Sequence, residues 1–225
     1  MKRDRIIRII FIVVVIICTI LYLLPTKATK DELKFKKEYE SINNKLNEKT
    51  NKKNRELTIP EKNGVEYLTA KEMLEKIDNK DTFIVYFGFA DCPWCRSIIE
   101  TLITTMKDNG IKDIYYVDIK EIRDEYLVKN GYLIKQKEGT KDYYKLLKKL
   151  KGVLENYEVK DENGNKVSTG ETRIYAPNIV GIKDGKAVIM ETGISDEEKD
   201  PYMKLTDDIK KDTKKQIEKV INKIY

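Results

Sequence analysis

The stretch that decides the fold is Phe83-Ile84-Val85-Tyr86-Phe87-Gly88-Phe89-Ala90-Asp91-Cys92-Pro93-Trp94-Cys95-Arg96. Its apolar, β-branched and aromatic part, Phe83 to Phe89, predicts a buried central strand. Pro93 suits the first turn of a helix, and the periodic apolar residues that follow, up to Gly110, predict that helix. Cys92 and Cys95 therefore fall where a helix begins at the edge of a sheet.

This position affects the acidity and the reactivity of the two cysteines. A helix N-terminus has unpaired N–H groups and the positive end of the macrodipole, so a thiolate there is stabilised and its pKa falls below the free value of ~8.5. The i, i+3 spacing brings both sulfurs to one side of the first turn. We expect Cys92 to be the exposed nucleophile and Cys95 the buried resolving thiol. Arg96 and Asp91 carry opposite charges nearby, and the sequence leaves open which is closer.

Two other interpretations of the cysteine pair stay open. A structural zinc site needs four Cys or His ligands. The chain has no histidine, and its third cysteine, Cys18, lies in an apolar segment, so zinc would require a second chain or carboxylate ligands. An inert buried pair is the other alternative. Dithiol chemistry is the favoured interpretation, and it needs no metal or organic cofactor beyond a redox-active disulfide between Cys92 and Cys95.

The N-terminus predicts a membrane anchor. Residues 6–24 are almost unbroken Ile, Val and Leu, long enough to span a hydrocarbon core as a helix. Basic residues within 1–5 precede it, which keeps this tip in the cytoplasm and the remainder of the chain outside. A cleaved signal peptide would need a better cleavage site than residues 24–28 offer, and a lipoprotein at Cys18 would need a small residue before it.

Charge and spacing divide the remaining chain. Charged residues make up 36% of the sequence and the net charge is +6, but the lysines are spread over helical faces and the linker, so we expect no nucleic-acid partner. Residues 25–63 are highly charged and predict a stalk helix or flexible linker. Residues 64–225 form the compact domain, in which strands and helices alternate as in a parallel α/β sheet.

Residues 120–172 predict an insertion within this domain. Residues 121–129 and 141–157 have helical patterns, and residues 157–168 predict a hairpin around Asn163-Gly164. Two further strands around the turn at 183–186, and a closing helix over 203–224, complete the domain.

The pattern resembles the thioredoxin superfamily. The resemblance covers roughly residues 65–225 and rests on the strand before Cys92-Pro93-Trp94-Cys95 and on the segment 174–186, in which Pro177 precedes a strand and an Asp-Gly turn. It implies a thioredoxin-like fold, with a central mixed sheet flanked by helices, here carrying a helical and hairpin insertion. Within the superfamily the chain looks most like extracytoplasmic thioredoxin-like proteins of Gram-positive bacteria, including bacteriocin transport accessory proteins.

The resemblance also implies roles for residues near the cysteines. Pro177 would be a cis-proline lying against the redox pair, leaving the backbone of Ala176 to pair with an extended substrate in a groove that Pro93 and Trp94 share. A trans proline that begins a strand is the alternative. The sequence departs from thioredoxins at Tyr86, where they keep a buried Asp that helps to deprotonate the resolving thiol.

These observations predict a membrane-anchored, extracytoplasmic thiol–disulfide oxidoreductase. Cys92 would exchange disulfides with cysteine-containing exported proteins or peptides, and Cys95 would resolve the mixed disulfide. A redox partner, which the sequence does not identify, would recycle the pair. The alternative is a non-catalytic thioredoxin-like accessory or binding module for an exported peptide such as a bacteriocin, in which the cysteines serve only as a structural bridge.

Overall fold

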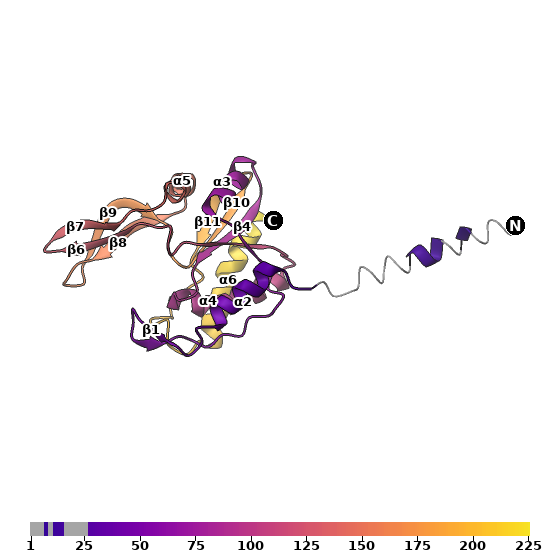
Figure 1. Cartoon of the computed structure of the whole chain (residues 1–225), viewed down its shortest axis with the longest axis horizontal. Coiled ribbons are helices and arrows are strands. Elements are labelled where there is room, and N and C mark those ends of the chain that lie inside the picture. Colours follow the sequence, from indigo (N-terminus) through magenta and orange to yellow (C-terminus); the bar gives the residue numbers. More distant parts are fainter. Residues whose placement is uncertain (1–6, 9–10, 16–26) are drawn as a thin grey trace.

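The computed structural model describes residues 7–8, 11–15 and 27–225 of the chain. Its centre is a five-stranded mixed sheet with the strand order β11-β10-β4-β5-β3, flanked by helices (Figure 1). The strands are β3 (Val65–Tyr67), β4 (Phe83–Gly88), β5 (Ile114–Asp118), β10 (Asn178–Lys183) and β11 (Lys186–Glu191). β3, β5 and β4 run parallel, whereas β10 is antiparallel to both β4 and β11. The expected mixed α/β architecture is therefore confirmed.

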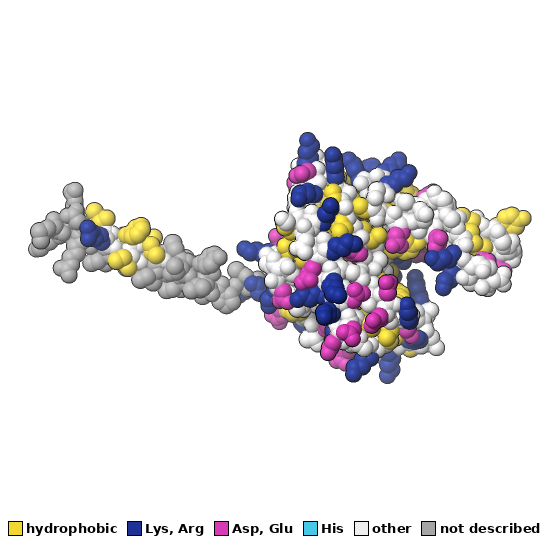
Figure 2. Space-filling view, turned by 180° about the vertical axis from the view of Figure 1, so that it is seen from behind, with side chains coloured by type: hydrophobic (Ala, Val, Ile, Leu, Met, Phe, Trp, Pro, Cys, Tyr) yellow, Lys and Arg dark blue, Asp and Glu magenta, His cyan; other side chains and the backbone are white. Residues whose placement is uncertain are grey.

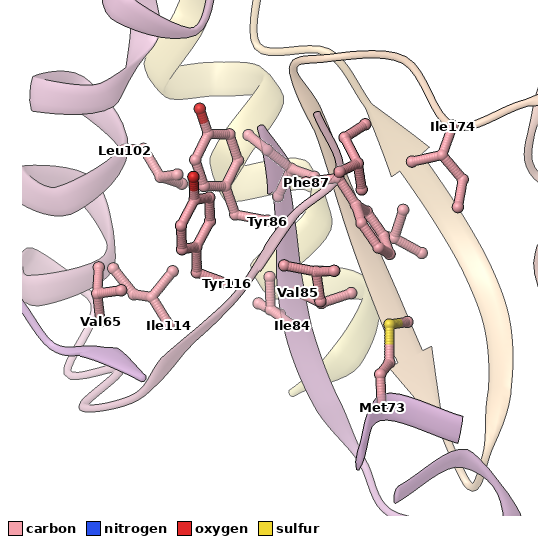
Figure 3. Close-up of a cluster of buried hydrophobic side chains, with 14 of the residues drawn as sticks. Val65, Met73, Ile84, Val85, Tyr86, Phe87, Leu102, Ile114, Tyr116 and Ile174 are labelled. Carbon is pink, nitrogen blue, oxygen red and sulfur yellow. The ribbon is translucent and has the colours of Figure 1, made fainter. Parts of the chain in front are cut away.

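Strand β4 is the centre of the core. All six of its residues are buried, because helices cover both faces of the sheet. Tyr86 projects to the side occupied by Leu102 of α4 (Pro93–Asp108), and Val85 to the side occupied by Met73 of α3 (Ala70–Asp78) (Figure 3). The closing helix, α6 (Asp207–Ile224), packs against α4 and β10. The continuous apolar run of β4 is explained by this burial on two faces.

The segment before β3 differs from the expected stalk. Residues 30–63 belong to the compact domain: they form helix α2 (Lys30–Glu40), a short hairpin of β1 (Leu46–Asn47) and β2 (Lys52–Lys53), and an extended return. Phe35 and Tyr39 of α2 are fully buried, and so is Ile59 on the return. The few apolar residues of this charged segment are enough to hold it on the domain, because they pack into the aromatic cluster of the core. In that cluster the ring centroids of Phe35 and Tyr116 are 5.1 Å apart.

The insertion, residues 120–172, contains two hairpins and one helix. Strands β6 (Glu125–Lys129) and β7 (Tyr132–Lys137) form the first hairpin, α5 (Lys141–Leu150) follows, and β8 (Glu155–Lys160) pairs with β9 (Lys166–Arg173). The predicted helix over 121–129 is wrong, because Asn130 and Gly131 take positive φ angles and turn the chain into β7. The hairpin around Asn163-Gly164 is confirmed, and α5 occupies the first part of the predicted helix over 141–157. Both hairpins project from one side of the domain (Figure 1).

The predicted anchor, residues 6–24, falls largely outside the described residues, as does Cys18. Of this segment, residues 7–8 and 11–15 are described, and they are helical. Within the part of the chain that the structure describes, no helix combines the length and the hydrophobicity needed to cross a membrane.

Charges on the visible surface are mixed. Lysine and arginine side chains alternate with aspartate and glutamate over the face shown in Figure 2. The exposed apolar side chains of the insertion are Tyr132, Leu133 and Ile134 of β7. Interspersed charges of both signs are typical of a solvated protein surface.

Candidate functional site

The two cysteines lie where β4 passes into α4. The strand ends at Gly88, the chain turns over residues 89–91, and Pro93 occupies the first turn of α4. Cys92 is the N-cap residue: its backbone is extended, and its Sγ accepts a hydrogen bond from the N–H of Cys95 at 3.3 Å. A helix N-cap normally uses an oxygen for this contact. Here the sulfur takes that place. The predicted position of the cysteines, at the start of a helix after the buried strand, is confirmed.

Cys95 lies one turn into the helix and is fully buried. Cys92 and Cys95 are both free thiols, and each thiol shifts the pKa of the other. The i, i+3 spacing therefore places the two sulfurs side by side, as predicted.

A loop that is distant from Cys92 in the sequence, and that contains Ala176 and Pro177, covers this cysteine. The Ala176–Pro177 peptide bond is cis, so the predicted cis-proline is confirmed. The Cys92 thiol donates a hydrogen bond to the carbonyl oxygen of Ala176 at 3.2 Å. Immediately after the loop, Asn178 pairs with Phe87 in the sheet, so β4 and β10 together hold the loop beside the cysteine.

The expected exposure of Cys92 is wrong. Its side chain is buried, with 5% of the residue exposed, because the Ala176–Pro177 loop covers it. Pro93, Trp94 and Ala176 around it are each partly exposed. The sulfur therefore lies just beneath the surface, at a point where three partly exposed residues meet.

The electrostatics separate the two thiols. Burial raises the pKa of Cys92, but hydrogen bonds from the Cys95 thiol and from the N–H groups of Cys95 and Trp94, together with the charge of Arg123, bring the pKa below its ordinary value. Burial raises the pKa of Cys95 well above its ordinary value, and the neighbouring Cys92 raises it further. Within the pair, Cys92 is the thiol that ionises first.

Arg123 is a site residue that the sequence does not indicate. It comes from the insertion, lies with its guanidinium 4.8 Å from the centroid of the Phe89 ring, and stabilises the Cys92 thiolate. Its Nε is buried and has no hydrogen-bond partner among the described residues. No motif marks Arg123, because only the folded insertion brings it to the cysteines.

The residues flanking the motif have other contacts. The Arg96 guanidinium is buried and donates to the carbonyl oxygens of Tyr39 at 2.8 Å and Ala90 at 3.1 Å, and also to Arg55. Asp91 forms an ion pair with Lys120 at 2.6 Å. Arg96 therefore fixes the turn before Cys92 to the N-terminal segment, and Lys120 offsets the charge of Asp91.

In the described part of the chain, no group of three or more His, Cys, Asp or Glu residues gathers in a way that could hold a metal ion. Comparison of the sequence with protein-family models finds no match. Comparison with curated proteins also finds none.

Proposed function

We propose that this chain has a thioredoxin-like fold and acts as a thiol–disulfide oxidoreductase through Cys92 and Cys95. Three features support the proposal: the parallel strands β3, β5 and β4 followed by the antiparallel β10–β11 hairpin, the cysteine pair at the start of α4, and the cis-proline loop beside it. The observation that carries it is the Cys92 sulfur, held between the N–H of Cys95 and the carbonyl of Ala176.

The chemistry follows from the order in which the thiols ionise. The Cys92 thiolate attacks one sulfur of a client disulfide, a mixed disulfide forms, and the other client sulfur leaves as a thiolate. Cys95 then attacks Cys92, the two cysteines form a disulfide, and the second client sulfur is released. The reverse sequence oxidises a client dithiol. Because Cys92 is buried, an approaching client must displace the contact between the Cys92 thiol and Ala176.

In this proposal the client chain contacts the residues around Cys92, which are Pro93, Trp94, Ala176 and Pro177. The clients are cysteine-containing exported proteins or peptides, since the basic tip and the apolar run at 6–24 favour a single-pass anchor with the domain outside the cell. A separate redox partner restores the starting state of the cysteines. The reduction potential decides the direction: values near −270 mV indicate a reductase and values near −120 mV an oxidase.

The low exposure of Cys92 favours a second candidate, a thioredoxin-like module that binds an exported peptide without catalysis. In that case the cysteines only bridge the turn at the start of α4. The exposed apolar residues of β7 would then contribute to binding.

One experiment separates the two candidates. Full-length protein in detergent is equilibrated with reduced and oxidised glutathione, and the Cys92–Cys95 disulfide is quantified after acid quenching. An oxidoreductase gives a measurable potential, and a Cys95→Ala variant accumulates a mixed disulfide at Cys92. A binding module gives no mixed disulfide at Cys92, and its Cys92→Ser, Cys95→Ser variant still retains its peptide partner.

A further inference from the structure

Two tyrosine hydroxyls lie one after the other on the buried side of Cys95. Tyr39 of α2 and Tyr86 of β4 are both fully buried, and their hydroxyl oxygens are 3.2 Å apart. The Tyr86 hydroxyl and the Cys95 sulfur are neighbours across Gly88, since a Cβ atom at Gly88 would lie close to both. These groups therefore form a line from the N-terminal segment, through the central strand, to the buried sulfur.

Gly88 leaves room for this contact. A Cβ atom at that position would overlap the Tyr86 hydroxyl and would lie 3.1 Å from the Cys95 Sγ. The Tyr86 hydroxyl and the Cys95 sulfur thus occupy the space that a side chain at position 88 would fill. Tyr86 and Tyr116 point to the same side of the sheet (Figure 3), but the Tyr116 hydroxyl donates to the carbonyl of Gly88 at 3.4 Å.

Both tyrosine hydroxyls are protonated groups close to the Cys95 sulfur. Burial raises the pKa of Tyr86 and of Tyr39 well above the ordinary value, so both hydroxyls are protonated at neutral pH. The Tyr86 hydroxyl lowers the pKa of Cys95, which burial raises. The hydrogen bond between the Tyr39 and Tyr86 hydroxyls lowers the pKa of Tyr86, which makes Tyr86 a better donor.

We propose that Tyr86 stabilises the Cys95 thiolate during resolution of the mixed disulfide, and that Tyr39 is the positioning residue that orients the Tyr86 hydroxyl. This inference rests on the proposed oxidoreductase function and adds the group that makes a fully buried thiol able to react. It assigns a role to the N-terminal segment, which reaches the redox centre through Tyr39.

The resolving step balances with solvent water as the proton carrier. Cys95 gives its proton to water, and its Sγ attacks the Cys92 Sγ of the mixed disulfide. The bond between the two protein sulfurs forms, the bond from Cys92 to the client sulfur breaks, and its electron pair goes to the client sulfur, which takes a proton back from water. The cysteine pair is oxidised by two electrons and the client is reduced. Tyr86 keeps its proton throughout.

The test uses oxidised glutathione as the disulfide, with the reduced full-length protein in detergent. Acid quenching and mass spectrometry follow the glutathione adduct at Cys92 over time. In Tyr86→Phe we expect adduct formation at the unsubstituted rate and resolution at least about tenfold slower, as loss of a hydrogen bond to a charged group implies. Tyr39→Phe should slow resolution less. Tyr116→Phe removes a hydroxyl of equal burial outside the line and is the matched control.

The pH dependence gives a readout that a packing defect would not. The titratable groups that face Cys95 are Cys92 on its own helix, Tyr86 on β4, Tyr39 on α2 and Tyr116 on β5. We expect the rise of the resolution rate with pH to move to higher pH in Tyr86→Phe and not in Tyr116→Phe.

The outcomes separate the two proposals. Absence of a glutathione adduct in the unsubstituted protein would overturn the oxidoreductase function before any variant is made. Normal exchange with an unchanged rate and pH profile in Tyr86→Phe would overturn the role of Tyr86 alone, and equal slowing in Tyr86→Phe and Tyr116→Phe would do the same. If Tyr86→Phe fails to fold, Tyr39→Phe decides: resolution as fast as in the unsubstituted protein overturns the inference.

Discussion

The Cys92 sulfur and the Ala176 carbonyl oxygen are 3.2 Å apart, although the two residues are 84 positions apart in the chain. Between them lie helix α4, strand β5 and the whole insertion. The sheet brings them together, because β10 pairs with β4 immediately after the loop. The Cys92 thiol and the Ala176 backbone are therefore positioned by the same two central strands.

Arg123 should control the acidity of Cys92. Replacing it in Arg123→Gln removes a positive charge that stabilises the thiolate, so we expect the pKa of Cys92 to rise and its alkylation by iodoacetamide at neutral pH to slow severalfold. Arg123→Lys keeps the charge and should retain most of the rate. Mass spectrometry assigns the alkylation to Cys92. Equal rates in Arg123→Gln and the unsubstituted protein would remove Arg123 from the site.

The buried ion pair of Asp124 and Arg173 should stabilise the domain only when both partners are present. The Arg173 guanidinium donates to the backbone carbonyl of Asp124 at 3.0 Å and to its carboxylate at 3.3 Å, and both side chains are almost fully buried. Arg173→Leu leaves the Asp124 charge unpaired, so we expect a loss of about 3–5 kcal/mol in the free energy of unfolding, measured in urea. The Asp124→Leu, Arg173→Leu double variant should lose less than Arg173→Leu. A greater loss in the double variant would contradict this account.

Glu198 should make stability depend on pH. Burial raises the pKa of this carboxyl group, and this effect outweighs the opposing influence of Ser97 and of the Arg55 charge. A raised folded-state pKa favours the protonated form, so its stabilising effect is complete below the unfolded pKa of about 4.3 and is lost as pH rises through the folded pKa. We expect Glu198→Gln to melt at a higher temperature than the unsubstituted protein at pH 8, with the difference shrinking toward pH 4.

The neighbouring Glu197 provides the control for this prediction, because it is exposed. Glu197→Gln should melt at the temperature of the unsubstituted protein across the same pH range. A melting-temperature difference for Glu198→Gln that stays constant with pH would show that Glu198 does not titrate as described.

Arg96 should hold the N-terminal segment on the domain. Its guanidinium donates to carbonyl oxygens of that segment and of the turn before Cys92, and a lysine cannot reproduce this fork. We expect Arg96→Lys to lower the free energy of unfolding by about 2 kcal/mol or more and to increase proteolysis within residues 41–63. Lys37→Gln, an exposed change on α2, should leave both unchanged. An unaltered proteolysis pattern in Arg96→Lys would contradict this role.

Local signals predicted the centre of the site. The apolar run before Cys92 and the proline after it determine the strand, the turn and the helix start through interactions within a few residues. The cis bond at Pro177 was predicted from a resemblance rather than from physics. The sequence therefore located both cysteines and the loop that contacts them.

Contacts between distant segments were not predictable in this way. Residues 30–63 are mostly charged, and their few apolar side chains are informative only once the aromatic cluster around Tyr116 exists. The burial of Cys92 and the approach of Arg123 depend on the folded loop and insertion. The β6–β7 hairpin is different, because Asn130-Gly131 is a strong turn signal that could have indicated it.

The pKa of the Cys92 thiol tests the central claim most directly. It is obtained from the pH dependence of alkylation of Cys92 in the reduced, folded, full-length protein. We expect a pKa below the ordinary value of about 8.5, because the N-cap hydrogen bonds and Arg123 outweigh the effect of burial. A pKa at or above that value, or a Cys92 that no reagent alkylates until the protein unfolds, would contradict the claim.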